Sequence, residues 1–238
     1  DYRNGGDPED LAEGDRRFQR FGALLQDLQR AHRDYDFGDE EILSDIGVVS
    51  EGRVRVGKMS YGAVLLPFLR TIRRSTLDLF FAFAEADGTI LVAGNMPELV
   101  DGEPDPERLE RLADVSVLVA PGDTAAALAE AVPPAVKATG PGAEHVWIHR
   151  RKTRGGRMVM LYNVSRLEPA SLTVSMASGV REAVVWDPGA GRCLSAAPQE
   201  NGTLRVDLAP AQSLFVSTGE LSEQAAVSGA YRGQGASR

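Results

Sequence analysis

Acidic side chains are concentrated between positions 34 and 41, where two carboxylates could share a site. Glycoside hydrolysis needs such a pair, one as general acid and one as base or nucleophile. The candidates for this role are Asp34, Asp36 and Glu40, with Asp39 and Glu41 beside them. Acidic residues also gather at the first turn of a helix, because the helix dipole favours negative charge there. A short helix capped by Gly38 or Asp39 is the simpler explanation, and catalysis or metal binding is the alternative.

Asn95 is a candidate ligand-binding residue because it follows a predicted strand, 89–93. In α/β domains, ligands bind beyond the carboxyl ends of the strands. A tight turn at Gly94-Asn95 is the alternative. The segments after the predicted strands contain no nucleophile elbow, no GxGxxG and no phosphate-binding loop. The sequence therefore argues against covalent acyl transfer and predicts no cofactor.

Trp147 and His149 are candidates for carbohydrate binding, beside a basic hairpin loop at 150–157. A tryptophan ring can stack on a sugar, although aromatic residues on strands more often belong to the core. His145 and His149 share a strand face, but two ligands without a third do not make a metal site. Cys193 is the single cysteine, so we predict no disulfide within the chain and no metal site.

The composition is that of a globular protein. The 238 residues include 26 Lys and Arg against 34 Asp and Glu, a net charge of −8, which argues against nucleic acid or an anionic membrane as partner. No stretch approaches the ~20 apolar residues that span a bilayer. The first residue is not Met and no signal-peptide core follows, so we expect a piece of a longer protein. The residue usage fits a GC-rich bacterial genome, and cytoplasmic and secreted locations both stay open.

Strands alternate with helices in the first part of the chain. A helical stripe at Phe18, Phe21, Leu25 and Leu28 needs a partner surface. Further along, apolar runs predict strands separated by helices, which indicates βαβ units. We therefore predict an α/β domain over 15–142 with a doubly wound, mostly parallel sheet, after a disordered lead-in at 1–14. The predicted strands are 53–56, 63–67, 89–93 and 115–119.

In the second part of the chain, the apolar residues recur with a period of two and no longer with the period of a helix. Six short strands with turn signals between them, and no helical pattern, indicate a small antiparallel β-sandwich over 143–219. The residues from 220 to 238 are rich in Ser, Gly, Gln and Ala, so we expect a disordered tail.

Several motifs resemble large glycoside hydrolases of the α-L-rhamnosidase-like group, and together they cover about 30–218. The first set resembles a domain similar to class I glutamine amidotransferases without the catalytic cysteine, a flavodoxin-like fold that β-galactosidases also use for trimerisation. The later set resembles their closing β-sandwich. The motifs are YDFGDEEIL at 35–43, GRVRVG at 52–57, YGAVLLP at 61–67, GTILVAG at 88–94, VWIHRR at 146–151, LYNVS at 161–165, VWDP at 185–188 and LAP at 208–210.

The resemblance implies a non-catalytic accessory or assembly region. A catalytic (β/α)₈ barrel needs about 250 residues, and the two predicted domains already occupy this chain. The implied partners are the barrel of the parent enzyme or neighbouring subunits. The alternatives are a carbohydrate-binding module that uses Trp147 and His149, and a small glycosidase that uses the acidic residues at 34–41.

Overall fold

The computed structural model describes residues 8–153, 156–176, 183–196, 198–199 and 201–219. The expected lead-in at 1–7 and the expected tail at 220–238 lie outside the described residues. The chain divides into two compact units. Unit 1 comprises 1–27 and 35–133, and unit 2 comprises 28–34 and 134–238. The chain therefore enters unit 2 briefly at 28–34 before it returns to unit 1.

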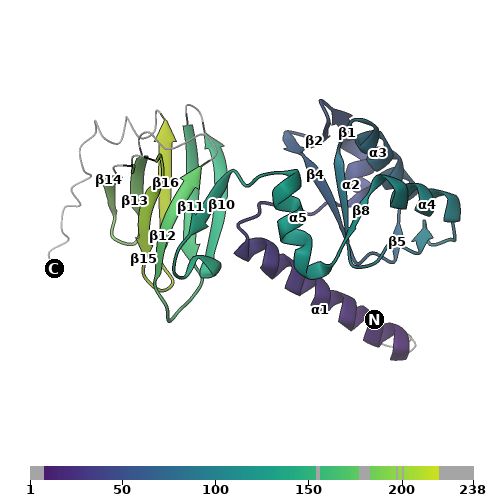
Figure 1. The fold of residues 1–238 in the computed structure, drawn as a ribbon, viewed down its shortest axis with the longest axis horizontal. Coiled ribbons are helices and arrows are strands. Elements are labelled where there is room, and N and C mark those ends of the chain that lie inside the picture. Colours follow the sequence, from purple (N-terminus) through teal and green to yellow (C-terminus); the bar gives the residue numbers. More distant parts are fainter. Residues whose placement is uncertain (1–7, 154–155, 177–182, 197, 200, 220–238) are drawn as a thin grey trace. The chain divides into compact units, whose positions relative to one another are not determined.

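Unit 2 consists of two antiparallel sheets that lie face to face (Figure 1). The five-stranded sheet has the order β10-β11-β16-β13-β14, and the three-stranded sheet has the order β15-β12-β9. The strands are β9 (Val136–Thr139), β10 (Val146–Thr153), β11 (Gly156–Asn163), β12 (Ala170–Met176), β13 (Ala183–Asp187), β14 (Arg192–Ala196), β15 (Leu204–Leu208) and β16 (Ser213–Gly219).

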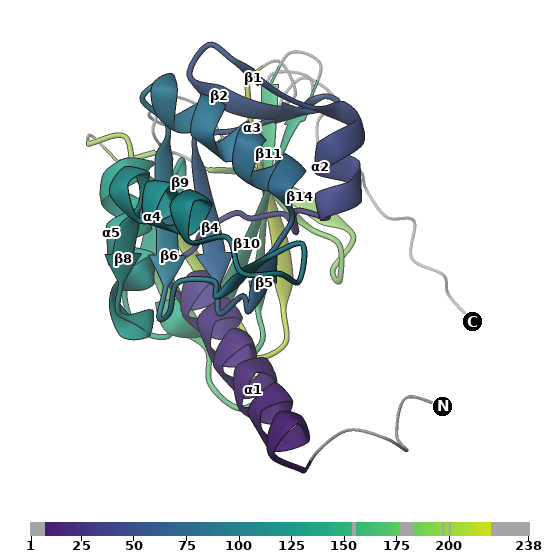
Figure 2. The ribbon, with the colours of Figure 1, turned by 90° about the vertical axis from the view of Figure 1, so that its right-hand side faces the viewer.

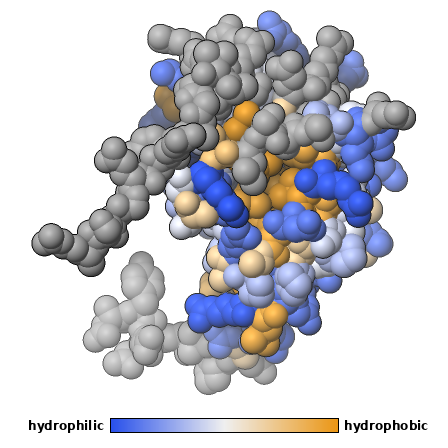
Figure 3. All heavy atoms as spheres, turned by 90° about the vertical axis from the view of Figure 1, so that its left-hand side faces the viewer, coloured by the Kyte–Doolittle hydropathy of each residue, from blue (hydrophilic) through white to orange (hydrophobic). Residues whose placement is uncertain are grey.

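The core of unit 2 lies between these sheets. Alternate residues of each strand point inward, because successive side chains of a strand face opposite sides. The inward residues include Val146, Leu161 and Val216 from the wider sheet and Leu172 and Leu208 from the narrower one. Figure 3 shows that hydrophobic side chains also reach the surface, where hydrophilic ones border them. Apolar side chains are therefore not confined to the interior.

Unit 1 contains one small parallel sheet with the order β4-β6-β8. Helices connect its strands, and the central strand β6 is buried on both faces (Figure 2). The core lies against α3, which contributes Leu77, Phe80 and Phe83. The elements are β4 (Ala63–Pro67), α3 (Arg74–Glu85), β6 (Thr89–Ala93), α4 (Pro106–Val115), β8 (Val117–Val119) and α5 (Thr124–Ala131), with a two-stranded parallel pair of β5 (Thr71–Ile72) and β7 (Leu99–Val100).

The predicted doubly wound, mostly parallel sheet is wrong. Parallel pairing is confined to β4-β6-β8 and the short β5–β7 pair, and the other described sheets are antiparallel. The strands β1 (Gly47–Ser50), β2 (Arg53–Val56) and β3 (Met59–Tyr61) form an antiparallel sheet of their own. Two-residue turns join them, and such turns can connect only antiparallel neighbours. Glu51 and Gly52 have φ of 56° and 66°, as the first of these turns requires.

The order of the parallel strands does not support the flavodoxin-like and amidotransferase-like description either. A doubly wound sheet adds strands on both sides of the first one and so reverses direction. Here β4, β6 and β8 follow one another in chain order. The sheet therefore lacks the reversal at which such folds bind their ligands.

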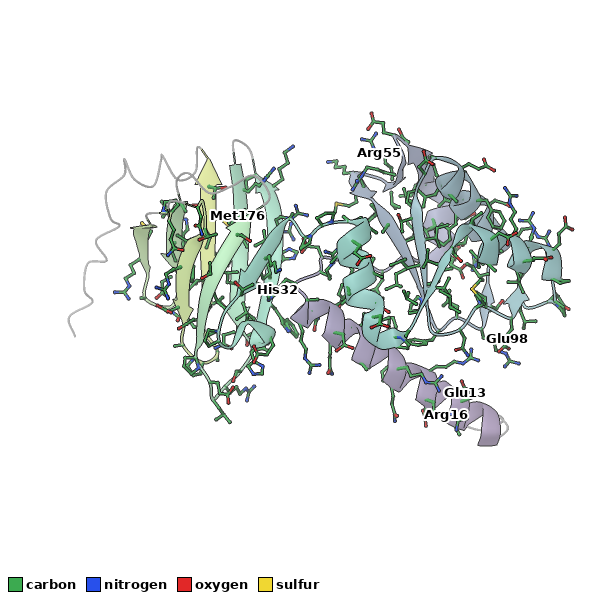
Figure 4. The ribbon with its side chains drawn as sticks, viewed as in Figure 1. Glu13, Arg16, His32, Arg55, Glu98 and Met176 are labelled. Atoms are coloured by element: carbon green, nitrogen blue, oxygen red, sulfur yellow. The ribbon has the colours of Figure 1, made fainter. Side chains whose placement is uncertain are left out.

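Helix α1 (Pro8–Arg30) begins within the expected lead-in. Its N-terminal half extends away from the sheet of unit 1 (Figures 1 and 2). Figure 4 shows Glu13 and Arg16 there; Glu13 pairs with Arg16 at 2.9 Å and Arg17 at 3.0 Å, and these cations lower the pKa of the Glu13 carboxyl. Of the predicted apolar stripe, Leu28 is buried, Phe21 and Leu25 are half-buried and Phe18 is 77% exposed. The stripe is thus covered increasingly toward the end of the helix, where Leu24, which the stripe did not include, is also buried.

Candidate functional site

The three acidic candidates have separate structural partners. Asp34 belongs to unit 2, where its Oδ2 lies 3.3 Å from Nε of Arg150 on β10. Both side chains are partly exposed, and an ion pair of this kind contributes little to stability. The pair joins the 28–34 segment to the edge strand of the five-stranded sheet.

Asp36 belongs to unit 1, where its Oδ2 accepts a 2.7 Å hydrogen bond from the Tyr61 hydroxyl on β3. Burial, together with this hydrogen bond and the carboxylate charge, raises the pKa of Tyr61 to about 12. The phenol therefore stays protonated at neutral pH and acts as a donor. The geometry anchors the segment that precedes α2 (Glu40–Ile46).

Glu40 and Asp39 act at helix ends. Oε1 of Glu40 accepts a 2.8 Å hydrogen bond from the backbone N–H of Arg73, immediately before α3. Asp39 is the N-cap of α2, and its Oδ1 accepts from the N–H groups of Glu41 and Ile42, each at 3.0 Å. Capping by Asp39 is therefore confirmed.

The three candidate carboxylates each have a different hydrogen-bond or ion-pair partner. Asp34 lies in one unit, and Asp36 and Glu40 lie in the other. No group of three or more His, Cys, Asp or Glu side chains that could hold a metal occurs among the described residues. Each candidate carboxylate instead holds a neighbouring segment in place.

Asn95 lies at a shallow hollow of about 640 Å³ in unit 1. Its side chain is exposed, directly after Gly94, whose φ of +81° suits glycine. The hollow sits beyond the carboxyl ends of β6 and β8, the region that the sequence singled out. Its lining is mostly apolar, with one cation: Arg20, Phe68, Gly94, Asn95, Leu118, Val119, Ala120 and Pro121.

Trp147 and His149 lie on the same face of β10, as the alternation predicted. Trp147 is 44% exposed and His149 is exposed, so neither belongs to the core of unit 2. The ring of Tyr162 on β11 stands edge-on to Trp147, with centroids 6.5 Å apart. Arg151 follows two residues after His149 on this face and is also exposed.

Sequence reasoning missed the strand partners of these residues. Tyr162 lies directly opposite Trp147, and Met160 lies opposite His149. Phe215 on β16 lies opposite Met160, and Trp186 on β13 lies opposite Phe215. The alternation within each strand was a signal for the outward residues, but the pairing register that aligns them was not readable from one strand.

The comparisons with known proteins show a shared fold only. No protein-family model matches the chain, and no curated protein matches it in sequence. Solved structures of glycoside hydrolases do match it. A rhamnosidase from Novosphingobium sp. PP1Y has a TM-score of 0.61 at 16% identity, over 78% of this chain and 20% of that chain.

Two further structures give the same result. A β-galactosidase from Bacillus circulans sp. alkalophilus has a TM-score of 0.57 at 12% identity, over 85% of this chain and 37% of that one. The GH42 exo-carrageenase from Bacteroides ovatus has a TM-score of 0.51 at 14% identity, over 83% of this chain and 26% of that one. The chain is thus similar in fold to a part of these glycoside hydrolases and spans well under half of their length.

No helix in the described residues combines the length and the apolar character that a membrane span requires.

Proposed function

We propose that the chain is a non-catalytic accessory and assembly region of a glycoside hydrolase polypeptide. The observation that carries this proposal is the share of each chain that the structural match covers. About four-fifths of the chain matches glycoside hydrolases in fold, 78% for the rhamnosidase, but only 20% of that enzyme is covered. The rest of such an enzyme, or a neighbouring subunit, is the partner that we propose.

The positions of the carboxylates support a non-catalytic role. A glycosidase needs two carboxyl groups at a defined separation of about 5–10 Å across the scissile bond. Asp36 and Glu40 are each engaged by a donor from another element, Tyr61 or the backbone N–H of Arg73. Asp34 belongs to the other unit. These contacts are structural, and they favour the non-catalytic role over the alternative of a small glycosidase.

Exposed apolar residues in unit 1 supply a surface for assembly. Strand β8 is at the edge of its sheet, and its Val117 and Leu118 are 55% and 57% exposed. Phe18 on α1 is 77% exposed. An edge strand with apolar side chains is normally covered or paired in a folded protein. We assign these exposed apolar residues to contact with the partner.

Hydrolysis by the purified chain tests the proposal. Nitrophenyl glycosides of rhamnose, galactose and fucose should be left intact. Turnover that disappears in Asp36→Asn or Glu40→Gln, with the fold retained, would overturn the non-catalytic role. Turnover that is unchanged in both variants and is removed by further purification would come from a contaminant and would leave the proposal in place.

Binding of an apolar fluorescent dye tests the assembly surface. The dye should bind unit 1 less in Phe18→Ser and Leu118→Ser than in the parent chain. Leu167→Ser is the matched control, because Leu167 is 88% exposed in unit 2. Equal dye binding by the parent and by both unit 1 variants would contradict the assignment of this surface.

A carbohydrate-binding module is the second candidate function. The observation that favours it is the exposed Trp147 ring with Tyr162 beside it on the outer face of the five-stranded sheet. Aromatic rings offer an apolar face to the C–H groups of a sugar. Loss of oligosaccharide binding in Trp147→Ala is the expected result, and unaltered binding would remove this candidate.

A further inference from the structure

The outward-facing side chains of the five-stranded sheet line up in rows across its strands. We call this the outer sheet face. Because residues opposite each other in an antiparallel pair share a face, the register defines the rows. The first row is Trp147, Tyr162 and Ser213; the second is His149, Met160, Phe215, Trp186 and Cys193; the third is Arg151, Met158, Ser217 and Val184.

The outer sheet face is partly buried at the β13 and β16 end and exposed to solvent at the β10 end. Nε1 of Trp186 donates a 2.8 Å hydrogen bond to Oγ of Ser217, and Ser217 is buried. At the opposite end, on β10, the side chains of Trp147, His149 and Arg151 are exposed. A ligand on this face would therefore meet the β10 side chains first.

The charge of the open end is unusual for this chain. The chain as a whole carries a net charge of −8, yet none of the residues in the three rows is Asp or Glu. Among the described residues, neither His149 nor Arg151 has an ion pair or a hydrogen bond from its side chain. The three rows thus present the guanidinium of Arg151, and no carboxylate, beside the exposed indole of Trp147.

These groups match the chemistry of a negatively charged sugar. Arginine is a donor only, and its planar guanidinium pairs with a carboxylate through two parallel hydrogen bonds. The hydroxyl groups of a neutral sugar also need hydrogen-bond acceptors. Among the described side chains of this face, the hydroxyl groups and the imidazole of His149 are the acceptors. The indole and phenol rings would contact the apolar side of the sugar ring.

We propose that the outer sheet face binds an acidic saccharide, with Trp147 and Tyr162 against the sugar ring and Arg151 paired with its carboxylate. The inference rests on the carbohydrate-binding candidate of the preceding section and adds the charge of the ligand. Arg151 determines specificity in this arrangement, whereas Trp147 supplies the contact area that acidic and neutral sugars would share.

Calorimetric titration of the full chain with trigalacturonate, and with the uncharged galactotriose, tests the proposal. Trigalacturonate should bind more tightly and lose affinity as salt rises, since salt screens an exposed ion pair. Trp147→Ala should abolish binding. Arg151→Gln should weaken binding of trigalacturonate roughly tenfold and remove the preference for it. Arg205→Gln is the matched control, an exposed arginine on β15 of the other sheet.

The outcomes separate the inference from the function beneath it. Equal affinity for both trisaccharides, or a preference that survives in Arg151→Gln, overturns the acidic ligand and leaves carbohydrate binding in place. No binding of either sugar overturns both, while the accessory role in a glycoside hydrolase stands. Tighter binding of a single-stranded oligonucleotide than of trigalacturonate also overturns the inference, because stacking and cations suit bases as well.

Discussion

The hydroxyl of Tyr61 donates a 2.7 Å hydrogen bond to Oδ2 of Asp36, a residue 25 positions earlier in the chain. Burial, the hydrogen bond to Asp36 and the charge of that carboxylate together raise the pKa of Tyr61 to about 12. One tyrosine of the native chain should therefore titrate near pH 12 in an absorbance titration. This late step should be missing in Tyr61→Phe and should move to lower pH in Asp36→Asn.

The same shift makes stability depend on pH. The folded state favours the neutral phenol, so its contribution is fully present below the ordinary tyrosine pKa of about 10 and is lost as the pH rises toward 12. The midpoint of urea unfolding should fall more steeply over this range in the parent chain than in Tyr61→Phe. Parallel curves for the two proteins would contradict the assignment.

His32 gives a second pH-dependent contribution, in unit 2. Its Nε2 lies 3.0 Å from the carbonyl oxygen of Ala143 (Figure 4 labels His32), and burial lowers the pKa of the imidazole while Lys137 acts in the same direction. The backbone hydrogen bonds to Ala143 and Val146 oppose this shift without cancelling it. The neutral form is favoured on folding, so stability is present above about pH 6.5 and is lost as the pH falls through the lowered pKa.

The variant His32→Asn checks this contribution. Asparagine tolerates the left-handed backbone at this position, where φ is 55°, but does not titrate. The Tm should fall less between pH 7 and pH 5 in His32→Asn than in the parent chain. His149→Asn is the control, since His149 is exposed, and it should retain the parent slope. Equal slopes in all three proteins would exclude His32 as the source.

Local signals in the sequence identified several helix starts and strand faces. Asp105 with Pro106 predicts a helix N-terminus, and Asp105 is the N-cap of α4, where its Oδ1 accepts from the N–H of Arg108 at 3.2 Å. Trp147 and His149 share a face because strand alternation is a local property. Caps and alternation depend on a few adjacent residues, so a single sequence contains them.

Pairing between distant residues was not predictable in the same way. The alternation at 53–56 indicated a strand, but its antiparallel neighbours depend on the turns around Gly52 and Gly57, both with positive φ. Those turns make a meander where a doubly wound sheet was expected. The acidic residues were judged by their closeness in sequence, yet the chain passes from unit 2 to unit 1 between Asp34 and Tyr35. The partners of these carboxylates, Arg150, Tyr61 and the backbone N–H of Arg73, lie far along the chain, and sequence spacing could not indicate them.

Asn163 should be a main determinant of the stability of unit 2. Its side chain is fully buried and joins three segments: Nδ2 donates to the carbonyls of Glu168 at 2.8 Å and Ala209 at 3.2 Å, and Oδ1 accepts from the N–H of Ser165 at 3.0 Å. Asn163→Ala leaves these backbone groups without their partner. A buried group left unpaired costs about 1–3 kcal/mol, so urea unfolding should show a loss of roughly this size or more.

Asn201→Ala is the matched control for Asn163→Ala. Asn201 also begins an Asn-x-Ser/Thr sequence and also accepts from the backbone N–H two residues later, Thr203, at 3.1 Å, but it is exposed. Because water can replace the lost contact, this variant should change stability by less than about 0.5 kcal/mol. Similar losses in the two variants would show that the turn, and not burial, sets the contribution of Asn163.

The burial of Asn163 also predicts which of the two Asn-x-Ser/Thr sequences can be glycosylated. An oligosaccharyltransferase acting on the folded chain should modify the exposed Asn201 and leave the buried Asn163 unmodified, as peptide mapping would show.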